Sequence, residues 1–586
     1  MLSLPNKFHS LSLNLLPTEF KLRTQTRSTF RQLAFCAGFC ITLFSASLLA
    51  QEATGGDYHF DLSLDGLALD DGLGFSVAPL GDLNGDGISD FAAGANLASP
   101  NGTRSGQVLV YSGADGTILL QLDGRVPAER FGSSISATGD LDNDGIQDLL
   151  VGAILASPGG LNFAGSVYAI SGATGVELFR IDGTDANDFL GEDIDTIEDL
   201  NGDGIDDLLV SQTGWQGGAI LKIGAVQVIS GADGSLIRRI EGTDLVSNFG
   251  NALATVNDTD GDGIQDILVG AYLADPNAVS NAGSVFLYSG ATGNLLQRID
   301  GFAGQQAFGV AVASAGDVNG DGSDDLLIGA NQFGLQSGEA YVYSGATGDQ
   351  IYLFEGGQNS KLFGGAVAAA GDINGDGVPD QMIGDWRECV NQIDDTGAVY
   401  FYSGADGSLM QRVPGTQNAA AFGYSIASLR GSTDFLVGAP NATAGGQTLA
   451  GMVHTGGVDP YLMADSLSIS SAAGGTLTYQ LDFPDDHAGL KSIMVASFAG
   501  PGTFSIFGIE LPLQGSPLLN RTIAAFQPGS VATLDAFGNG TVQVVFAPNQ
   551  LRNGVGDLLE ICALGVDPVG SLPLTVSIPA ILEITP

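Results

Sequence analysis

The residues best suited to chemistry in this chain are acidic side chains that recur in six short segments with one spacing. Each segment follows the pattern D-x-[DN]-x-D-G-x-x-D, which places oxygen-bearing side chains at positions 1, 3, 5 and 9. Calcium takes roughly six to eight oxygen ligands, and alternate carboxylates on a tightly curled backbone can converge on one such ion. The pattern therefore predicts about six bound calcium ions.

The predicted calcium ligands are the side chains at positions 1, 3, 5 and 9 and the backbone carbonyl at position 7, as in an EF-hand-type loop. In chain order these residues are Asp82, Asn84, Asp86, Ile88, Asp90; Asp140, Asp142, Asp144, Ile146, Asp148; Asp199, Asn201, Asp203, Ile205, Asp207; Asp258, Asp260, Asp262, Ile264, Asp266; Asp317, Asn319, Asp321, Ser323, Asp325; Asp372, Asn374, Asp376, Val378, Asp380. Position 6 is always glycine and position 4 is glycine or Asn143, which tolerate the positive φ of a tight curl. One Asp-rich segment alone would pass for an ordinary turn, but six matching copies favour metal binding.

The elements that must hold these segments are β-strands. Apolar runs such as 149–153 and 267–271 follow the Asp segments, which are therefore predicted to join two strands. From residue 58 the chain repeats a unit of about 59 residues. A complete unit opens with Phe-Gly or a similar pair, followed by a strand, the Asp segment and a second strand that ends in a Gly-Ala-like pair. A variable loop, a third strand, a Ser-Gly-Ala turn and a fourth strand complete it. Seven four-stranded units predict an all-β fold, a seven-bladed β-propeller.

The two ends of the repeat array indicate how the ring closes. Residues 58–66 have the pattern of a fourth strand with no unit before it, whereas the seventh unit stops after 452–454 without a fourth strand. These two parts are predicted to complete one blade, which removes an exposed sheet edge. The seventh unit has only residues 430–434 where the others have the Asp segment, so it is predicted to bind no calcium.

These motifs resemble the FG-GAP repeats of the integrin α-chain N-terminal propeller and of related secreted bacterial proteins. The Phe-Gly opening, the Asp segment and the Gly-Ala pair carry the resemblance, which covers residues 58–457. It implies a propeller whose ions lie in loops between the first and second strands on one face, while partners dock on the opposite face. The chain has more Asp segments than integrin α chains typically have, and no apolar span follows the propeller, so an integrin-like receptor role is not implied.

Sequence patterns divide the chain into three regions. In residues 1–50, basic residues precede an uncharged apolar run from 33 to 50, which predicts a signal peptide. A retained N-terminal membrane anchor is the alternative, because the run has 18 residues. Residues 51–459 are predicted to form the FG-GAP propeller closed by its N-terminal strand. Residues 460–586 are predicted to form a C-terminal β-rich domain resembling a small β-sandwich, because they alternate apolar and polar residues, as in 476–482.

The charge of the chain limits the partners that it can bind. Of 20 basic and 65 acidic residues, five basic and one acidic lie in the first 50, which leaves 15 against 64 in the rest of the chain. Such an acidic chain is predicted to bind no nucleic acid, and to meet a membrane only through an uncleaved N-terminal anchor.

Cys389 and Cys562 remain after signal cleavage, and the sequence leaves open whether they pair.

The predicted function is a secreted or cell-surface, calcium-binding, noncatalytic scaffold for extracellular adhesion or ligand binding. The expected partner is an extracellular protein or carbohydrate. Strand order places Trp215 and Trp386 on the rim opposite the Asp segments. There they either contact a ligand or pack over a blade edge.

Two alternatives to this scaffold remain. A propeller-based polysaccharide lyase or glycoside hydrolase would need only a carboxylate pair. Two observations argue against an enzyme. The only histidines after the predicted signal are His59, His454 and His487, and the sequence has no G-x-S-x-G motif, H-E-x-x-H motif or nucleotide-binding loop. No catalytic residue is therefore assigned. A structural surface-layer protein differs from the scaffold only in binding no saturable ligand.

Overall fold

The structure is a computed structural model. It describes residues 57–459 except 218–221, 332–336, 358, 390–394 and 430–433, and beyond residue 460 only the backbone of the strands between residues 469 and 585. The predicted signal peptide or anchor, residues 1–50, lies outside the described residues, as do Cys562 and most of the shortened segment at 430–434.

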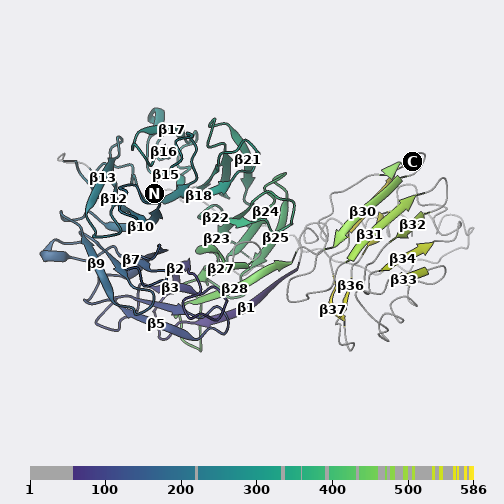
Figure 1. The fold of residues 1–586 in the computed structure, drawn as a ribbon, viewed down its shortest axis with the longest axis horizontal. Helices are drawn as coiled ribbons and strands as arrows, with labels where there is room; N and C mark the ends of the chain where they lie inside the picture. The colour runs from purple at the N-terminus through teal and green to yellow at the C-terminus, as the bar shows by residue number, and fades with distance from the viewer. Residues whose placement is uncertain are drawn as a thin grey trace, which may run out of the picture. The chain divides into compact units, whose positions relative to one another are not determined.

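Residues 57–459 form seven four-stranded antiparallel sheets, so the predicted seven-bladed propeller is confirmed (Figure 1). The first strands of blades 1 to 7 are β2 Leu73–Pro79, β6 Phe131–Ala137, β10 Leu190–Ile197, β14 Leu253–Val256, β18 Phe308–Gly316, β22 Ala366–Gly371 and β26 Ser425–Leu429. The second strands are β3 Phe91–Ala95, β7 Leu149–Ala153, β11 Asp207–Gln212, β15 Asp266–Ala271, β19 Asp325–Ala330, β23 Asp380–Asp385 and β27 Asp434–Ala439.

The third strands are β4 Gln107–Tyr111, β8 Ser166–Ile170, β12 Ala225–Ile229, β16 Ser284–Tyr288, β20 Glu339–Tyr343, β24 Ala398–Tyr402 and β28 Met452–Asp459. The fourth strands are β5 Ile118–Asp123, β9 Glu177–Asp182, β13 Leu236–Glu241, β17 Leu295–Asp300, β21 Gln350–Glu355, β25 Leu409–Pro414 and, for blade 7, β1 Asp57–Asp65. Two short 3-10 turns, η1 Pro158–Gly160 and η2 Pro276–Ala278, lie in second-to-third-strand loops.

The core lies between neighbouring blades. The second strands are buried along their whole length in blades 1 to 6, because both of their faces meet another sheet. One apolar cluster joins Val108 and Val110 of blade 1 to Leu149 and Val151 of blade 2, and the other clusters likewise span blade boundaries. The first strands of successive blades contact one another around the ring, including β2 with β26.

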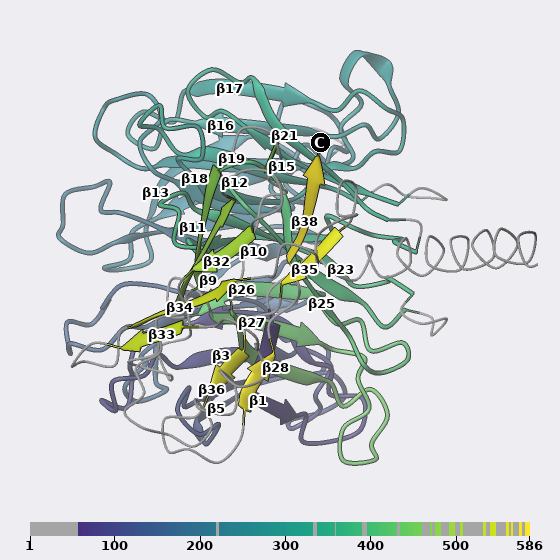
Figure 2. The ribbon, with the colours of Figure 1, turned by 90° about the vertical axis from the view of Figure 1, so that its right-hand side faces the viewer.

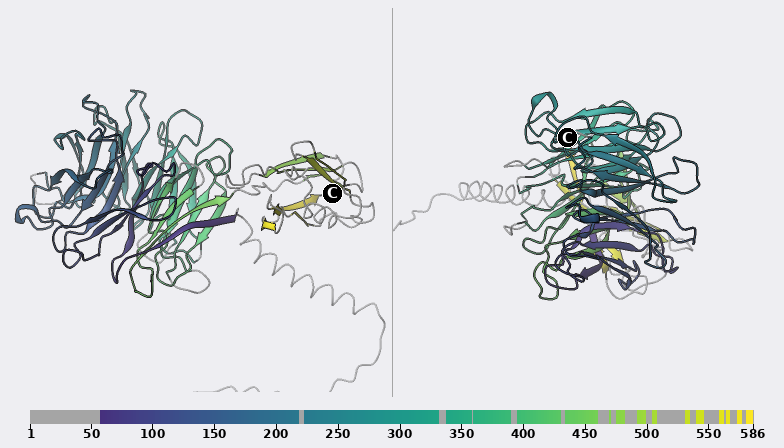
Figure 3. Two further views of the ribbon diagram at one scale, coloured as in Figure 1. Left: turned by 60° about the horizontal axis from the view of Figure 1, so that its bottom comes forward. Right: turned by 90° about the vertical axis from the view of Figure 1, so that its left-hand side faces the viewer.

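The ring closes through the pairing of β1 with β28. The register runs from Asp57 opposite Asp459 to Asp65 opposite Met452, with one irregularity between Phe60 and Leu62. The long purple strand beside the light green strands in Figure 3 is β1. This is the closure expected from the two half-units, and it leaves no open edge on β28.

The described strands beyond residue 460 also form β-sheets, and Figure 2 labels some of these strands. One sheet has the order β30 Gly475–Leu481, β31 Ser492–Phe498, β32 Phe504–Phe507, β34 Gly540–Val545 and β33 Val531–Leu534; another has β29 Ile469–Ser470, β38 Ala580–Thr585 and β35 Leu558–Ile561; and β36 Leu564–Val566 pairs with β37 Pro573–Val576. Among the described residues, we find no helix with the length and apolarity that a membrane span requires.

Candidate metal sites and the opposite rim

All six Asp segments connect the first and second strands of their blades, and we number them loop 1 (82–90), loop 2 (140–148), loop 3 (199–207), loop 4 (258–266), loop 5 (317–325) and loop 6 (372–380). Because the strands of a blade are antiparallel, these loops share one rim with the turns between third and fourth strands. We call it the loop rim. The loops between second and third strands and the linkers between blades form the other rim, which we call the variable rim.

Backbone amides curl each loop around its first aspartate. In loop 5, Asp317 Oδ1 accepts hydrogen bonds from the amides of Gly320 at 2.7 Å and Asp321 at 3.0 Å, and Oδ2 accepts one from Gly322 at 2.9 Å. Gly320 and Gly322 have φ of 75° and 93°, which an L side chain rarely adopts. The bonds from positions 5 and 6 to the first aspartate recur in the other five loops.

The aspartate at position 9 is fully buried in every loop. In loop 2, Asp148 Oδ2 accepts a hydrogen bond from the Leu141 amide at 2.8 Å, and Oδ1 accepts one from the Gly172 amide at 2.9 Å. Gly172 belongs to the Ser-Gly-Ala turn, so this aspartate ties the loop to the third and fourth strands. Loss of solvent raises the pKa of Asp325 to about 6 and that of Asp380 to about 7, whereas a bound cation would favour the charged carboxylate.

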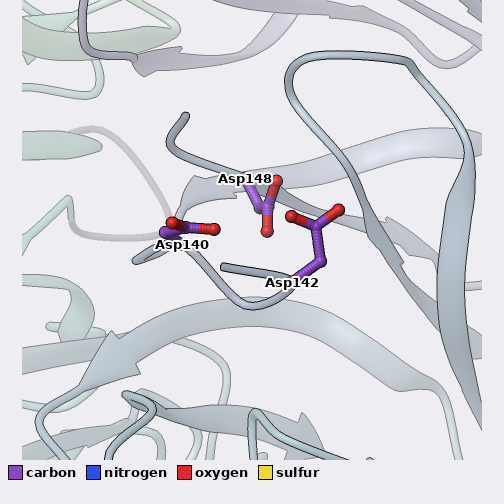
Figure 4. A group of neighbouring side chains, drawn as sticks. All are labelled: Asp140, Asp142 and Asp148. Atoms are coloured by element: carbon purple, nitrogen blue, oxygen red, sulfur yellow. The ribbon is translucent and has the colours of Figure 1, made fainter. Parts of the chain in front are cut away.

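Carboxylates from separate positions converge in two of the loops. Asp140, Asp142 and Asp148 each bring a carboxylate oxygen to within 4.8 Å of the others, and Figure 4 shows them around one space. The first three aspartates of loop 4, at positions 1, 3 and 5, meet the same limit. Two oxygens that bind one calcium ion at about 2.5 Å lie at most about 5 Å apart, so both groups fit a calcium ion.

The serine that begins the Ser-Gly-Ala turn is a loop contact that sequence reasoning missed. Ser230 Oγ donates a hydrogen bond to Asp203 Oδ2 at 3.0 Å, and Ser344 Oγ donates one to Asp321 Oδ2 at 3.3 Å. The signal was present, because a serine begins this turn in every unit that carries an Asp loop. Its hydroxyl holds the position-5 carboxylate from outside the loop.

The variable rim holds both tryptophans, each half-buried. The Arg239 guanidinium lies 4.0 Å from the centre of the Trp215 ring, and Trp215 Nε1 is buried with no hydrogen-bond partner among the described residues. Trp386 contacts Tyr424 edge-on, with ring centres 5.4 Å apart, and Tyr424 lies 5.0 Å from Phe75. Each tryptophan thus packs on neighbouring side chains and keeps part of its surface exposed.

Strained backbone concentrates on the variable rim. Among the described residues, every non-glycine residue with positive φ except Asn143 lies in a second-to-third-strand loop or a linker between blades. Arg130, with φ of 57°, and Phe189, with φ of 53°, are examples in the linkers. Such conformations cost about 1–3 kcal/mol each and persist where the surrounding structure imposes them, often at functional sites.

Two part-buried acids on β10, Asp193 and Asp195, contact the next blade. Asp193 Oδ2 accepts a hydrogen bond from the Leu253 amide at 2.7 Å, and Asp195 Oδ2 accepts one from the Thr255 amide at 2.8 Å. The amides belong to β14, the first strand of the next blade. Loss of solvent raises the pKa of Asp193 to about 7. Both carboxyls therefore cap the inner edge of a strand, a role that sequence reasoning did not assign.

Comparisons with known proteins agree with this geometry. A family model described as "FG-GAP repeat" matches residues 73–111, 131–170, 249–288 and 308–343, which are the first three strands of blades 1, 2, 4 and 5. The propeller is integrin-alpha-like and carries FG-GAP repeats.

Three integrin alpha chains illustrate the likeness. Integrin alpha-V of Gallus gallus is 32% identical over 286 residues, 47% of this chain and 21% of that protein. Integrin alpha-PS2 of Drosophila melanogaster is 35% identical over 169 residues, 25% of this chain and 12% of that protein. Integrin alpha-4 of Xenopus laevis is 32% identical over 216 residues, 35% of this chain and 20% of that protein. The chain spans about a fifth or less of the length of these relatives.

A solved structure titled "Crystal structure of BBS1N in complex with ARL6DN, soaked with mercury" has a TM-score of 0.42 at 10% identity, over 69% of this chain and 98% of that chain. That likeness is too low to bear on fold or function.

The FG-GAP motifs have a physical basis in how blades meet. The glycine of each Gly-Ala pair lies against the carbonyl of the Phe-Gly glycine in the next blade, and a Cβ at Gly152 would lie 2.5 Å from the Gly191 oxygen. The same close approach joins Gly270 to Gly309. Blade 3 has Ser211 at the corresponding position. Blades 3, 6 and 7 are not among the segments that the family model matches.

Proposed function

We propose that this FG-GAP propeller is a secreted or cell-surface, noncatalytic scaffold that binds an extracellular protein or carbohydrate and is stabilised by calcium ions. The observation that carries the proposal is the division between the rims. Six Asp loops of one geometry occupy the loop rim, whereas irregular loops with strained backbone and part-exposed aromatic rings occupy the variable rim.

Calcium binding is supported by the donor set of each loop. Side-chain oxygens at positions 1, 3, 5 and 9 and the carbonyl at position 7 are the hard oxygen ligands that calcium takes, and they would hold the ion in all six loops. A bound ion would neutralise carboxylates that otherwise repel one another. It would also join strands one and two of the blade, because position 9 begins or directly precedes the second strand.

Ligand binding at the variable rim is supported by its aromatic side chains. Trp386, in a second-to-third-strand loop, and Tyr424, in the linker before β26, form one chain of ring contacts with Phe75 near the start of β2. Flat aromatic surfaces stack on sugar rings and anchor protein partners, and rigid strands behind them lower the entropy lost on binding.

A binding screen tests the ligand-binding part of this proposal. The secreted chain would be probed in calcium against arrays of glycans and extracellular matrix proteins, together with Trp386→Ala and the control Val176→Ala. Val176 is 61% exposed and lies next to a Ser-Gly-Ala turn on the loop rim. We expect Trp386→Ala to weaken binding at least about tenfold and Val176→Ala to leave it unchanged. Equal binding by all three proteins would contradict the assignment of the variable rim, and no binding at all would contradict the scaffold.

A further inference from the structure

Neighbouring Asp loops contact one another through position 8, which none of the predicted calcium ligands occupies. The side chain at position 8 of one blade reaches the residue directly before position 1 in the preceding blade. We call that preceding residue the base residue of its loop. The base residues of loops 1 to 5 are Gly81, Gly139, Glu198, Asn257 and Gly316, and the position-8 residues of loops 2 to 6 are Gln147, Asp206, Gln265, Asp324 and Pro379.

Three of these contacts are hydrogen bonds. The Gly81 amide donates to Gln147 Oε1 at 2.6 Å, and the Glu198 amide donates to Gln265 Oε1 at 3.1 Å. Asp324 Oδ2 accepts from Asn257 twice, from the backbone amide at 3.3 Å and from Nδ2 at 3.0 Å. Each bond joins residues 66 or 67 positions apart, so the contact exists only once the blades have packed side by side.

The other two contacts are steric. A Cβ at Gly139 would lie 2.6 Å from Asp206 Oδ2, and a Cβ at Gly316 would lie 2.7 Å from Pro379 Cγ. The base residue is glycine at both places, so the position-8 side chain of the next blade has room to lie against the backbone. All five boundaries between consecutive Asp loops therefore carry the contact.

The hydrogen bonds at the first boundary form a continuous path between two position-9 aspartates. The Asp90 amide donates to the Gly81 carbonyl at 3.1 Å, which closes loop 1 at its base. The Gly81 amide in turn donates to Gln147, and Gln147 directly precedes Asp148 in loop 2. Whatever orders loop 2 around Asp148 thus also orders the acceptor that holds the base of loop 1.

We infer that the position-8 side chains are positioning residues that couple the calcium loops, so that an ion in one loop raises the calcium affinity of the loop in the preceding blade. This inference rests on the proposed calcium binding. An ion fixes the backbone of its own loop, and a neighbour held by that backbone then loses less entropy when it binds its own ion. The contact runs from position 8 of one blade to the base residue of the preceding blade. The coupling free energy is nevertheless the same in both directions, so an ion in the preceding loop also raises the calcium affinity of the following loop.

Hydrogen–deuterium exchange of the full chain, titrated with calcium, measures each loop separately. The readout is the calcium concentration that gives half-protection of the amides in loop 1, with loop 5 as an internal reference. The variants are Gln147→Ala, Gln147→Glu, Asp144→Ala, which removes a predicted ligand of loop 2, and the combination of Gln147→Ala with Asp144→Ala. The matched control is Ser89→Ala, which changes position 8 of loop 1, where the preceding blade 7 has no Asp segment.

We expect Gln147→Ala and Asp144→Ala each to raise the loop 1 midpoint about fivefold or more and the combination to raise it no further. Gln147→Glu keeps an acceptor oxygen and should retain the wild-type midpoint. Ser89→Ala should shift no loop, and the loop 5 midpoint should stay constant throughout, which shows that the variants are folded.

The negative outcomes are distinguishable. Absence of calcium-dependent protection in every wild-type loop would overturn the proposed calcium binding itself. Protection in all loops with an unchanged loop 1 midpoint in Gln147→Ala would overturn the coupling alone. A shift in Gln147→Ala without one in Asp144→Ala would show that Gln147 supports loop 1 irrespective of the ion in loop 2, which also overturns the coupling.

Discussion

At the scale of single residues, the carboxyls of this propeller have distinct roles that their shared chemistry does not reveal. The first aspartate of each loop gathers backbone amides at the surface, whereas the ninth is buried and ties the loop to a turn about 24 residues later. Asp193 lies outside the loops and caps a neighbouring blade. The place of each acid in the fold, rather than its residue type, therefore determines what its carboxyl does.

The raised pKa of Asp193 predicts a pH-dependent contribution to stability. Its carboxyl has a pKa of about 7 in the folded protein and close to 4 when unfolded, so the folded state holds the proton more tightly. The contribution of the protonated Asp193 carboxyl to the free energy of unfolding is therefore complete below about pH 4 and is lost as the pH rises through about 7. Thermal unfolding of the wild type and Asp193→Asn at pH 5 and pH 8 measures this. We expect the melting temperature of the wild type minus that of Asp193→Asn to be larger at pH 5 than at pH 8. The same difference at both pH values would contradict this prediction.

At the scale of elements, the main features are the close approach of blades and the closing strand. Both could be predicted in part from the sequence. The strand at 58–66 and the missing fourth strand after 452–454 are local patterns, and they located the closure. The packing of Gly152 on Gly191 could not be predicted, because it depends on which residues of neighbouring blades meet.

Replacing Gly270 with alanine tests the approach between blades. Its added Cβ would collide with the Gly309 carbonyl, which is backbone and cannot move aside. We expect Gly270→Ala to lower the free energy of unfolding by about 2–3 kcal/mol, an overpacking cost. Gly357→Ala is the control, because no atom lies within 4 Å of the position where its Cβ would be. Urea unfolding of both variants measures the difference, and equal stability would count against the interlock.

The closing strand β1 makes a second prediction at this scale. Phe60 packs against Phe422 and Phe435, with ring centres 6.0 and 6.1 Å away. Phe60→Ala should lower the free energy of unfolding by about 2–3 kcal/mol, somewhat less than the same change at a fully buried phenylalanine. Phe302→Ala is the matched control, because Phe302 is 67% exposed, and its effect should stay within about 0.5 kcal/mol. If the two variants lose the same stability, β1 does not hold the ring closed through this contact.

At the scale of the whole molecule, the propeller separates a uniform loop rim from an irregular variable rim. The sequence indicated this division, because strand order repeats from unit to unit and the spacing of aspartates recurs in six of the seven units. It did not reveal the contacts between loops, since Gln147 and Gly81 are 66 residues apart. Gln147 occupies a position that the Asp pattern leaves unspecified, and Gly81 lies just before the pattern. The strained backbone of the variable rim was likewise invisible, because residues such as Phe189 and Arg130 are unusual at positive φ.

Removing calcium should weaken the whole ring. Ions that bind the folded state alone add stability by mass action, and empty loops leave several carboxylates close together. We therefore expect a chelator to lower the melting temperature by many degrees, and re-added calcium to restore it more fully than the same concentration of sodium. Identical melting curves with and without chelator would argue against a stabilising role.

The most direct test of the account is the number of calcium ions bound per chain. Metal analysis and native mass spectrometry of the purified protein should give about six ions, and about five for the variant that combines Asp317→Ala with Asp321→Ala, because loop 5 then loses two of its predicted ligands. A protein that contains no calcium and takes none up at millimolar concentration would contradict the account.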